Sequence, residues 1–459
     1  MGPLGVQAYL HASDRETVAG SYWMRSATPI ILPLVLLNAK ALAGDDAKTD
    51  ASIDLALAQR YFAEAKALSD RDAGVLWGVR LYGPMMFVER ATRAVVANQA
   101  DGEGRLTERD GAYVGTLPDK ESVANTAFTW AGVKWTMIVW PLPTDEHARA
   151  ALMAHELWHR VQDGLGLPGA NPANSHLDSA DGRIWLRLEW TALEKALTSV
   201  DQERRTAIAD ALAFRAYRRS LYPDAAQQER SLEMHEGLAE YTGLVLSLET
   251  STAAIWRAVR ALQEGAKKPS FVRSFAYASG PAYGLLLDAV RPDWRKGLRG
   301  RDDLGVLLAT SVSFETPADL KSSAVRRSEG YDGSRIIAGE TERDNARQKR
   351  VSEARAKFVE GPVLRLPFLK MNIEFDPNNI ESLDGVGSVY PTLRLTDEWG
   401  ILTVSNGALV NKEWSWVQVS VARDSSEPPA RGDGWTLQLN DGWKPKPDAR
   451  PGDWVLARP

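Results

Sequence analysis

The chain has 459 residues, a formal net charge of −5 and no cysteine. This length is sufficient for two or three domains with a large buried core. The acidic balance, without any block of basic residues, argues against a nucleic-acid-binding protein. The absence of cysteine excludes disulfides, thiol nucleophiles and thiol redox chemistry, so we expect core burial, and a bound metal if there is one, to stabilise the protein.

The first 43 residues predict an export signal. A charged start at 24–25 precedes an apolar run over 27–37, and the A-x-A-like sequence at 41–43 offers a cleavage site. We therefore expect residues 1–23 to be an over-extended start, residues 24–43 to be a signal peptide, and the mature protein to be periplasmic or secreted. The apolar run is too short to span a bilayer, so a permanent membrane anchor is the weaker alternative, and a buried helix is another.

From residue 44 the hydrophobic pattern predicts a helix followed by a small sheet. Residues 53–68 have the broad apolar face of an amphipathic helix. Short strands are predicted over 75–82, 85–88, 93–97 and 132–140. The last of these strands is the strongest and leads directly into the next helix, so we place it at the sheet edge, where an extended peptide can add as a further strand.

A metal-binding pattern lies in that next helix. His155, Glu156 and His159 have the spacing His-Glu-x-x-His, which places two imidazoles one turn apart on one helical face. Two such imidazoles bind zinc, and the glutamate between them acts as the base that deprotonates bound water. An amphipathic helix with two half-buried histidines is the alternative. The helix is predicted over 145–163, with Thr144 as its N-cap and Gly164 as its stop.

Candidates for a third metal ligand lie further along the chain. The loop over 165–181 contains His176 and Asp178, although ordinary polar loop residues explain both. Two amphipathic helices are predicted next, over 183–197 and 202–219, and the first of them contains Glu189, a second candidate ligand.

The segment over 232–243 contains two further acidic candidates. Glu236 and Glu240 lie four residues apart and therefore share a helical face. One carboxylate of such a pair can bind the metal while the other accepts a hydrogen bond from a histidine ligand and orients it. Tyr277 and Gly280 then precede a helix predicted over 281–290.

Three motifs in this order carry a family resemblance: His155-Glu156-x-x-His159, Glu236-Gly237-x-Ala239-Glu240-Tyr241 and Tyr277-x-x-Gly280. Together they resemble the gluzincin-type zinc metallopeptidases, and are most similar to the aminopeptidase branch. The resemblance spans residues 130–290 and implies an α+β, thermolysin-like zincin catalytic domain with a small mixed sheet plus helices. It implies that His155, His159 and Glu236 hold Zn²⁺, that Glu156 is the general base, that Tyr277 hydrogen-bonds the oxyanion, and that Glu240 stands behind a zinc histidine.

The chain also departs from that branch. The long separation of His159 from Glu236 implies a helical insertion over about 183–219 within a catalytic domain over 44–300. His235 stands where the branch usually has asparagine, and we expect it beside the site. No Gly-x-Met-Glu-Asn segment precedes the metal helix. The resemblance therefore implies hydrolysis of peptide or protein substrates without assigning an exopeptidase or endopeptidase specificity.

The last third of the chain changes its pattern twice. Residues 301–360 form a polar connector with a charged helix over 341–358, and residues 361–459 alternate with a period of two, which predicts an all-β domain. Its strands are predicted over 363–375, 392–395, 401–404, 414–419, 435–439 and 454–456. Six tryptophans are candidates for sugar stacking, although the core of a small β domain ordinarily takes at least half of such a set: Trp399, Trp414, Trp416, Trp435, Trp443 and Trp454.

Two hypotheses follow from the sequence. The first is an exported zinc metallopeptidase. The second is a non-catalytic envelope protein with a structural or decayed metal site and a β domain that binds a partner or a glycan. Glu156 favours the enzyme, because a structural zinc site has no use for a base beside an open coordination position. The sequence does not indicate an oligomeric state.

Overall fold

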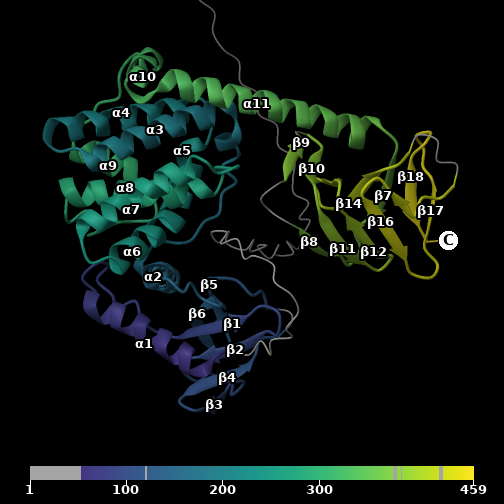
Figure 1. Cartoon of the computed structure of the whole chain (residues 1–459), viewed down its shortest axis with the longest axis horizontal. Helices are drawn as coiled ribbons and strands as arrows, with labels where there is room; N and C mark the ends of the chain where they lie inside the picture. The colour runs from purple at the N-terminus through teal and green to yellow at the C-terminus, as the bar shows by residue number, and fades with distance from the viewer. Residues whose placement is uncertain (1–52, 119–120, 376–379, 384, 423–426, 459) are drawn as a thin grey trace, which may run out of the picture. The chain divides into compact units, whose positions relative to one another are not determined.

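The computed structural model describes residues 53–458 apart from 119–120, 376–379, 384 and 423–426. The expected over-extended start and signal peptide lie outside these residues. The described chain is mixed α+β, as predicted, with an N-terminal sheet, a middle of ten helices and a β-rich C-terminal region with two sheets (Figure 1). In this described part no helix is both long enough and apolar enough to cross a bilayer.

The N-terminal sheet has six strands in the order β3-β4-β2-β1-β6-β5. Strands β1 and β6 are parallel, and the other neighbours are antiparallel. The strands are β1 (Met85–Glu89), β2 (Ala94–Ala97), β3 (Thr107–Arg109), β4 (Ala112–Thr116), β5 (Thr126–Trp130) and β6 (Val133–Trp140). The expected edge position of 132–140 is wrong, because β6 pairs on both sides and β5 forms the edge.

The strand predicted over 75–82 is also wrong, since this segment is a series of turns. Gly74 and Gly78 have φ angles of +83° and +76°, a left-handed conformation that interrupts an extended strand. The Asp72 carboxylate accepts hydrogen bonds from the amides of Gly74 and Leu76 at 3.1 and 3.0 Å, which fixes the first of these turns at the end of the preceding helix.

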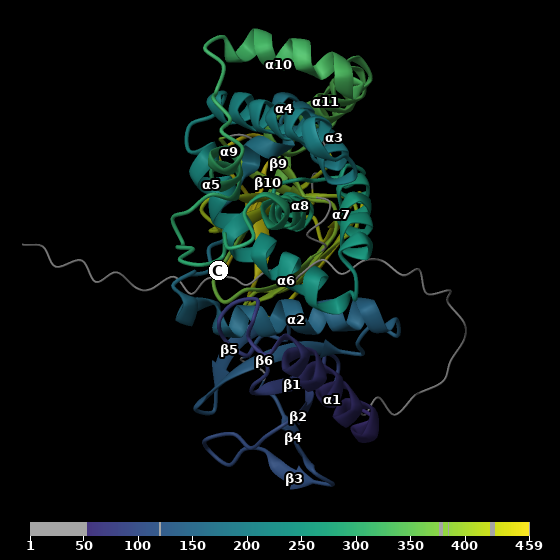
Figure 2. The same cartoon turned by 90° about the vertical axis from the view of Figure 1, so that its left-hand side faces the viewer.

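Two helices cover one face of this sheet (Figure 2). Helix α1 (Leu55–Asp72) contributes Phe62, and α2 (Glu146–Gln162) contributes Met153 and Leu157, to a buried cluster with Phe87 and Ile138 of the sheet. Trp158, on another side of α2, belongs instead to the core of the helical middle. Helix α2 is therefore held between two apolar layers, which orients its remaining face.

The ends of α2 differ in detail from the prediction. Asp145, not Thr144, is the N-cap, and its carboxylate accepts a hydrogen bond from the amide of Ala148 at 2.8 Å. The chain then passes through a 3₁₀ turn (Asp163–Leu165) and stops at Gly166, whose φ is +73°, rather than at Gly164.

The helical middle continues with α3 (Ala180–Thr198), α4 (Asp201–Ser220), α5 (Ala225–Leu232), α6 (Leu238–Ser247), α7 (Ser251–Gly265), α8 (Ser274–Val290), α9 (Leu304–Ser311), α10 (Leu320–Ser328) and α11 (Gly333–Arg355). The predicted helices over 183–197 and 202–219 correspond to α3 and α4. The helix predicted over 281–290 begins earlier, at Ser274, so Tyr277 lies in its first turn and Pro281 lies inside it.

The C-terminal region forms a seven-stranded sheet, β17-β18-β7-β14-β13-β10-β9, and a five-stranded sheet, β15-β16-β12-β11-β8. A shared core joins them, with Leu364 and Val417 from the first sheet and Leu395 and Leu402 from the second. The strands are β7 (Val363–Pro367), β8 (Asn372–Phe375), β9 (Glu381–Leu383), β10 (Gly387–Tyr390), β11 (Leu393–Asp397), β12 (Gly400–Val404), β13 (Ala408–Asn411), β14 (Trp416–Ser420), β15 (Arg431–Gly432), β16 (Trp435–Leu439), β17 (Lys444–Pro447) and β18 (Trp454–Ala457).

Two predictions about this region have clear outcomes. The strand predicted over 363–375 is two strands, β7 and β8, which belong to different sheets. Of the six tryptophans, Trp399, Trp435 and Trp454 are buried in the shared core, and Trp414 and Trp443 pack half-buried at its margin. Trp416 is half-buried against a separate cluster that contains Phe358 and Leu409.

Candidate metal centre

Three side chains converge at the face of α2 that is turned toward the helical middle. The Nε2 atoms of His155 and His159 are 3.1 Å apart, and Oε2 of Glu236 lies 3.4 and 3.5 Å from them. Zinc binds such atoms at about 2.0 to 2.1 Å, which in a tetrahedron separates the ligand atoms by about 3.4 Å. The three atoms therefore fit one ion, and within the described residues this trio forms a group able to hold a metal.

The hydrogen bonds behind the two imidazoles explain why they face each other. His155 Nδ1 lies 3.0 Å from Oε2 of Glu240, and His159 Nδ1 lies 3.0 Å from Oε1 of Gln162. Both outer atoms are acceptors, so each Nδ1 carries the proton and each Nε2 presents a lone pair. Two lone pairs and a carboxylate oxygen at such short separations repel one another unless a cation lies between them.

The charges around His155 agree with this requirement. Burial disfavours its charged form, but the adjacent carboxylates of Glu236 and Glu240 outweigh burial and hold the pKa of His155 well above its usual range. Burial likewise opposes the charge on Glu236, yet the two adjacent histidines keep the pKa of this carboxyl well below its ordinary value. The group thus favours a positive charge at its centre, which a divalent ion supplies.

Gln162 is a site residue that the sequence analysis missed. It is 2% exposed, and its amide also reaches the carbonyl of Met234 at 3.4 Å. Its position three residues after His159 on the same helix was the signal in the sequence that could have identified it. Gln162 therefore links the metal helix to the segment that carries Glu236.

That segment is a π-helical turn, Glu233–Gly237, between α5 and α6. The amide of Leu238 bonds the carbonyl of Glu233, five residues earlier, instead of four. Single π-turns inside helices occur frequently at functional sites, since the extra residue redirects a side chain. Here the turn places Glu236 toward His155 and His159, and Glu233 toward Arg215 at 2.9 Å on the other side.

Two glycines bring α8 to this turn. A Cβ on Gly280 would lie 2.3 Å from Cα of Gly237, and a Cβ on Gly237 would lie 3.1 Å from Cα of Gly280. Only glycine permits so close a backbone approach. The glycines of the Glu-Gly and Tyr-x-x-Gly motifs therefore pack on each other, and Tyr277, one turn before Gly280, reaches the metal group.

Tyr277 lies over the first histidine. Its ring is parallel to that of His155 at an interplanar angle of 3°, with the centroids 5.9 Å apart. Its hydroxyl is buried without a hydrogen-bond partner in the described chain. Burial and the nearby Glu236 raise the pKa of this hydroxyl well above 10, so Tyr277 keeps its proton and is available as a donor.

Glu156 is the most unusual group of the site. The residue is 1% exposed, and neither of its carboxylate oxygens has a hydrogen-bond partner among the described residues. Burial raises the pKa of Glu156, and His155 and His159 act in the opposite direction. A buried carboxylate without partners costs free energy, which a fold tolerates where the group serves a ligand or a reaction.

Two further side chains lie beside the trio. The His235 ring lies 4.7 Å from that of His159, and its Nδ1 donates to the carbonyl of Ala170 at 3.1 Å. Burial, together with His159, lowers the pKa of His235 to about 4, so this ring stays neutral. Arg273, also missed by the sequence analysis, places Nη2 3.4 Å from the outer oxygen of Glu236.

The other candidate ligands are occupied elsewhere. Glu189 accepts hydrogen bonds from Arg215, Arg218 and Tyr283 and is fully buried. His176 pairs with Glu229 at 2.9 Å, and Asp178 accepts from Ser270 and from the amide of Phe271. Glu236, and not Glu189, is therefore the acid that joins the two histidines.

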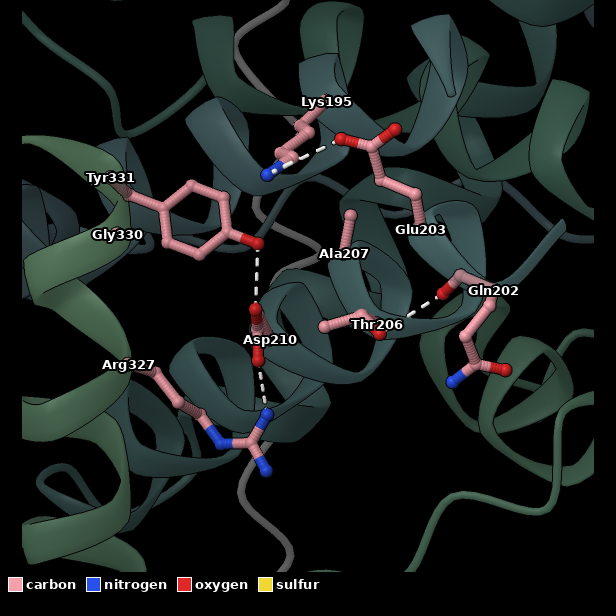
Figure 3. A pocket seen from close by; sticks show the side chains of 9 residues that line it. All are labelled: Lys195, Gln202, Glu203, Thr206, Ala207, Asp210, Arg327, Gly330 and Tyr331. Atoms are coloured by element: carbon pink, nitrogen blue, oxygen red, sulfur yellow. Dashed lines mark hydrogen bonds and ion pairs between the residues drawn. The ribbon is translucent and has the colours of Figure 1, made fainter. Parts of the chain in front are cut away.

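A separate hollow of about 260 Å³ lies against α3, α4 and α10 (Figure 3). Its charged groups pair with each other, since Asp210 accepts hydrogen bonds from Arg327 and Tyr331, and Lys195 lies 3.5 Å from Glu203. The hollow shares no residue with the metal group, and its paired charges leave no obvious chemistry.

Comparison with protein-family models, with curated proteins and with solved structures finds no match for this chain. The arrangement of its own residues therefore carries any functional conclusion.

Proposed function

We propose that this chain is an exported zinc-dependent metallopeptidase of the gluzincin type, with Zn²⁺ held by His155, His159 and Glu236. The observation that carries the proposal is Glu156, which directly follows a histidine of the metal group and is a buried carboxylate without a hydrogen-bond partner among the described residues. A metal site that serves only stability needs no such group, whereas hydrolysis needs a base next to the ion.

Each residue of the site has a separate role in the proposed hydrolysis. A zinc ion in this position supplies a Lewis acid for the substrate carbonyl and lowers the pKa of a bound water toward about 7. Glu156 accepts a proton from the attacking water and passes it to the departing amine. Tyr277, which holds its proton, donates a hydrogen bond to the carbonyl oxygen as negative charge develops there. Glu240 and Gln162 keep the two imidazoles in the tautomer that presents Nε2.

The sheet supplies a feature suited to an extended substrate. Strand β5 is the last strand on one side of the six-stranded sheet in the described chain, and it packs near α2. A peptide can add to such an edge through backbone hydrogen bonds. This favours peptide or protein substrates.

The experiment combines metal analysis with one substitution. We expect the purified protein to contain one zinc ion and to cleave members of a mixed peptide library. Glu156→Gln is expected to retain the zinc and to lose activity by about 100- to 10,000-fold, because general-base catalysis contributes that much. Glu146→Gln, which changes an exposed acid on the same helix, is the matched control and should cleave like the wild type.

One result would favour the alternative of a structural metal site in a non-catalytic envelope protein. A zinc-loaded wild type that cleaves no peptide of the library over a broad range of pH would contradict the peptidase proposal.

A further inference from the structure

Arg273 is a cation at the metal group whose donors are mostly free. It is the residue immediately before α8, and Tyr277 lies in the first turn of that helix, so both residues reach the site from the start of α8. Its Nη2 lies 3.4 Å from Oε1 of Glu236 and 3.2 Å from Oδ1 of Asn171. Its Nε and Nη1 have no hydrogen-bond partner among the described residues, and its side chain is 40% exposed.

Other arginines in this part of the molecule are used by the fold. Arg215 and Arg218 are buried in pairs with acids, and Arg160 of α2 donates to the carbonyl of Leu81 at 2.6 Å. Arg273 instead contacts the outer oxygen of Glu236, while the inner oxygen, Oε2, faces the histidines. A guanidinium in this position can contact a ligand as well as the protein.

The charges of the site decide what that ligand is. Glu156, Glu236 and Glu240 bring three formal negative charges to the site against the two positive charges of a bound Zn²⁺, which disfavours an anionic substrate unless a further cation is present. A guanidinium binds a carboxylate through two parallel N–H donors, and Arg273 has such donors to spare. One residue of extended peptide spans about 3.5 Å, so a group that touches both Arg273 and the site belongs to a residue adjacent to the cleaved bond.

We propose that Arg273 binds a carboxylate of the substrate, and that the enzyme prefers peptides that carry a carboxylate next to the cleaved bond. The inference rests on the proposed peptidase function and names its substrate class. The carboxylate has two sources, the free carboxyl terminus of a peptide or the side chain of an aspartate or glutamate. The experiment separates them.

The activity test uses zinc-loaded full-length protein and peptides that share one cleavable core. The first pair of peptides differs only at the carboxyl terminus, which is either a free acid or an amide. The second pair consists of longer amides that carry either glutamate or glutamine beside the cleaved bond. We expect one carboxylate-bearing member to exceed its neutral partner in kcat/KM by about 10- to 100-fold, the usual effect of a charge-assisted hydrogen bond. A preference for the free acid identifies the terminus, and a preference for glutamate identifies the side chain.

Arg273→Gln should reduce the ratio of kcat/KM for the carboxylate and neutral peptides to about one. Arg273→Lys should retain part of the preference, because lysine keeps the positive charge but lacks the two parallel N–H donors of the guanidinium. Arg291→Gln removes the same charge at the other end of α8 and should keep the wild-type ratio. A wild-type ratio of one overturns the inference while leaving the peptidase intact. The inference also fails if Arg273→Gln keeps the wild-type ratio. It fails as well if Arg273→Gln weakens zinc binding and slows the cleavage of all peptides equally, because Arg273 then only orients Glu236.

A binding measurement keeps the inference testable without turnover. Zinc-loaded Glu156→Gln protein is titrated calorimetrically with an N-acetylated dipeptide as free acid and as amide, and with its glutamate and glutamine forms. Tighter binding of a carboxylate form, lost in the double variant with Arg273→Gln, supports the inference. Equal binding of all four ligands contradicts it, whether or not the wild type cleaves peptides.

Discussion

The two histidines of the metal group differ in the acceptor behind each ring. His155 donates to the carboxylate of Glu240, whose side chain is 42% exposed, whereas His159 donates to the neutral amide of Gln162, which is 2% exposed. An anionic acceptor increases the basicity of an imidazole more than a neutral one does, but a buried acceptor holds the ring more firmly. We therefore expect Glu240 to strengthen metal binding mainly by increasing the basicity of His155, and Gln162 mainly by fixing the orientation of His159.

The neutral partner can be tested with a substitution that preserves size. Gln162→Leu removes the acceptor from Nδ1 of His159, so the ring loses both its fixed tautomer and its orientation. Zinc affinity, measured by competition with a chromophoric chelator, should fall by about 10- to 100-fold. The exposed Gln227→Leu is the control. Equal zinc dissociation constants for Gln162→Leu and the wild type would show that Gln162 merely fills space.

At the scale of the elements, the site depends on how closely three helices approach. Gly237 and Gly280 bring α8 against the π-helical turn, and a Cβ on Gly243 of α6 would lie 2.6 Å from the carbonyl oxygen of Ala151 in α2. Each contact replaces a side chain with backbone, which moves the helix axes together. In the Glu-Gly and Tyr-x-x-Gly motifs, the glycine therefore sets the distance between the helices, while the acid or the tyrosine supplies the functional group of the site.

Gly280→Ala tests this arrangement. Its methyl group meets the backbone of Gly237 at 2.3 Å, so α8 and the turn must separate, which typically costs about 1 to 3 kcal/mol of unfolding free energy. Because Glu236 and Tyr277 sit on the two displaced elements, zinc affinity should fall as well. Urea unfolding and chelator competition measure the two effects.

The control for that substitution is a helical glycine without neighbours. A methyl group on Gly339 of α11 would have no atom of the described chain within 4 Å apart from its own stretch of helix, so Gly339→Ala should raise the unfolding free energy by about 0.5 to 1 kcal/mol. If Gly280→Ala matches the wild type in both stability and zinc affinity, the close approach of the two glycines is not required.

At the scale of the whole helical middle, a buried ion network attaches the ligand-bearing turn to the surrounding helices. Glu233, three residues before Glu236, pairs with Arg215, which also contacts Glu189 of α3 and lies 3.6 Å from Asp303. Breaking one of these buried pairs would leave an uncompensated charge at a large cost in free energy, so the pairs lock the relative positions of α3, α4 and the turn. The remaining members are Arg218, Arg219, Glu229 and His176.

Asp303 gives this network a measurable pH dependence. Burial opposes its charge, but Arg215 and Arg219 lower its pKa from 3.8 to about 2. Its stabilising effect is therefore complete above pH 3.8 and is lost as the pH falls through about 2. The shift corresponds to about 2 kcal/mol of unfolding free energy.

Asp303→Asn isolates that effect, because an amide can still accept the hydrogen bond from the amide of Val306 that caps α9. The stability difference between wild type and variant should be largest near pH 6 and should shrink by about 2 kcal/mol as the pH approaches 2, as measured by urea unfolding. Asp54→Asn, at the exposed N-cap of α1, is the control. A difference that stays constant over this range would show that Asp303 is not titrating in the network.

Local patterns predicted the helices of the site better than its sheet. The spacing of His155 and His159 sets both rings on one face of α2, because helical geometry depends only on neighbours along the chain. The edge strand β5 and the turns over 75–82 were not predicted, because strand order and left-handed glycines depend on partners elsewhere in the fold. Gln162 and Arg273 were missed since neither belongs to a motif.

The sequence by itself determined the metal helix and its candidate ligands, because these follow from residue spacing, and the resemblance of its motifs implied the α+β class. Only the tertiary structure decided that Glu236 rather than Glu189 joins the histidines, and that Tyr277 lies over His155. It also decided that Glu156 is left without a partner among the described residues. These outcomes depend on a π-turn, a pair of touching glycines and a buried ion network, whose energies arise between segments distant in the chain.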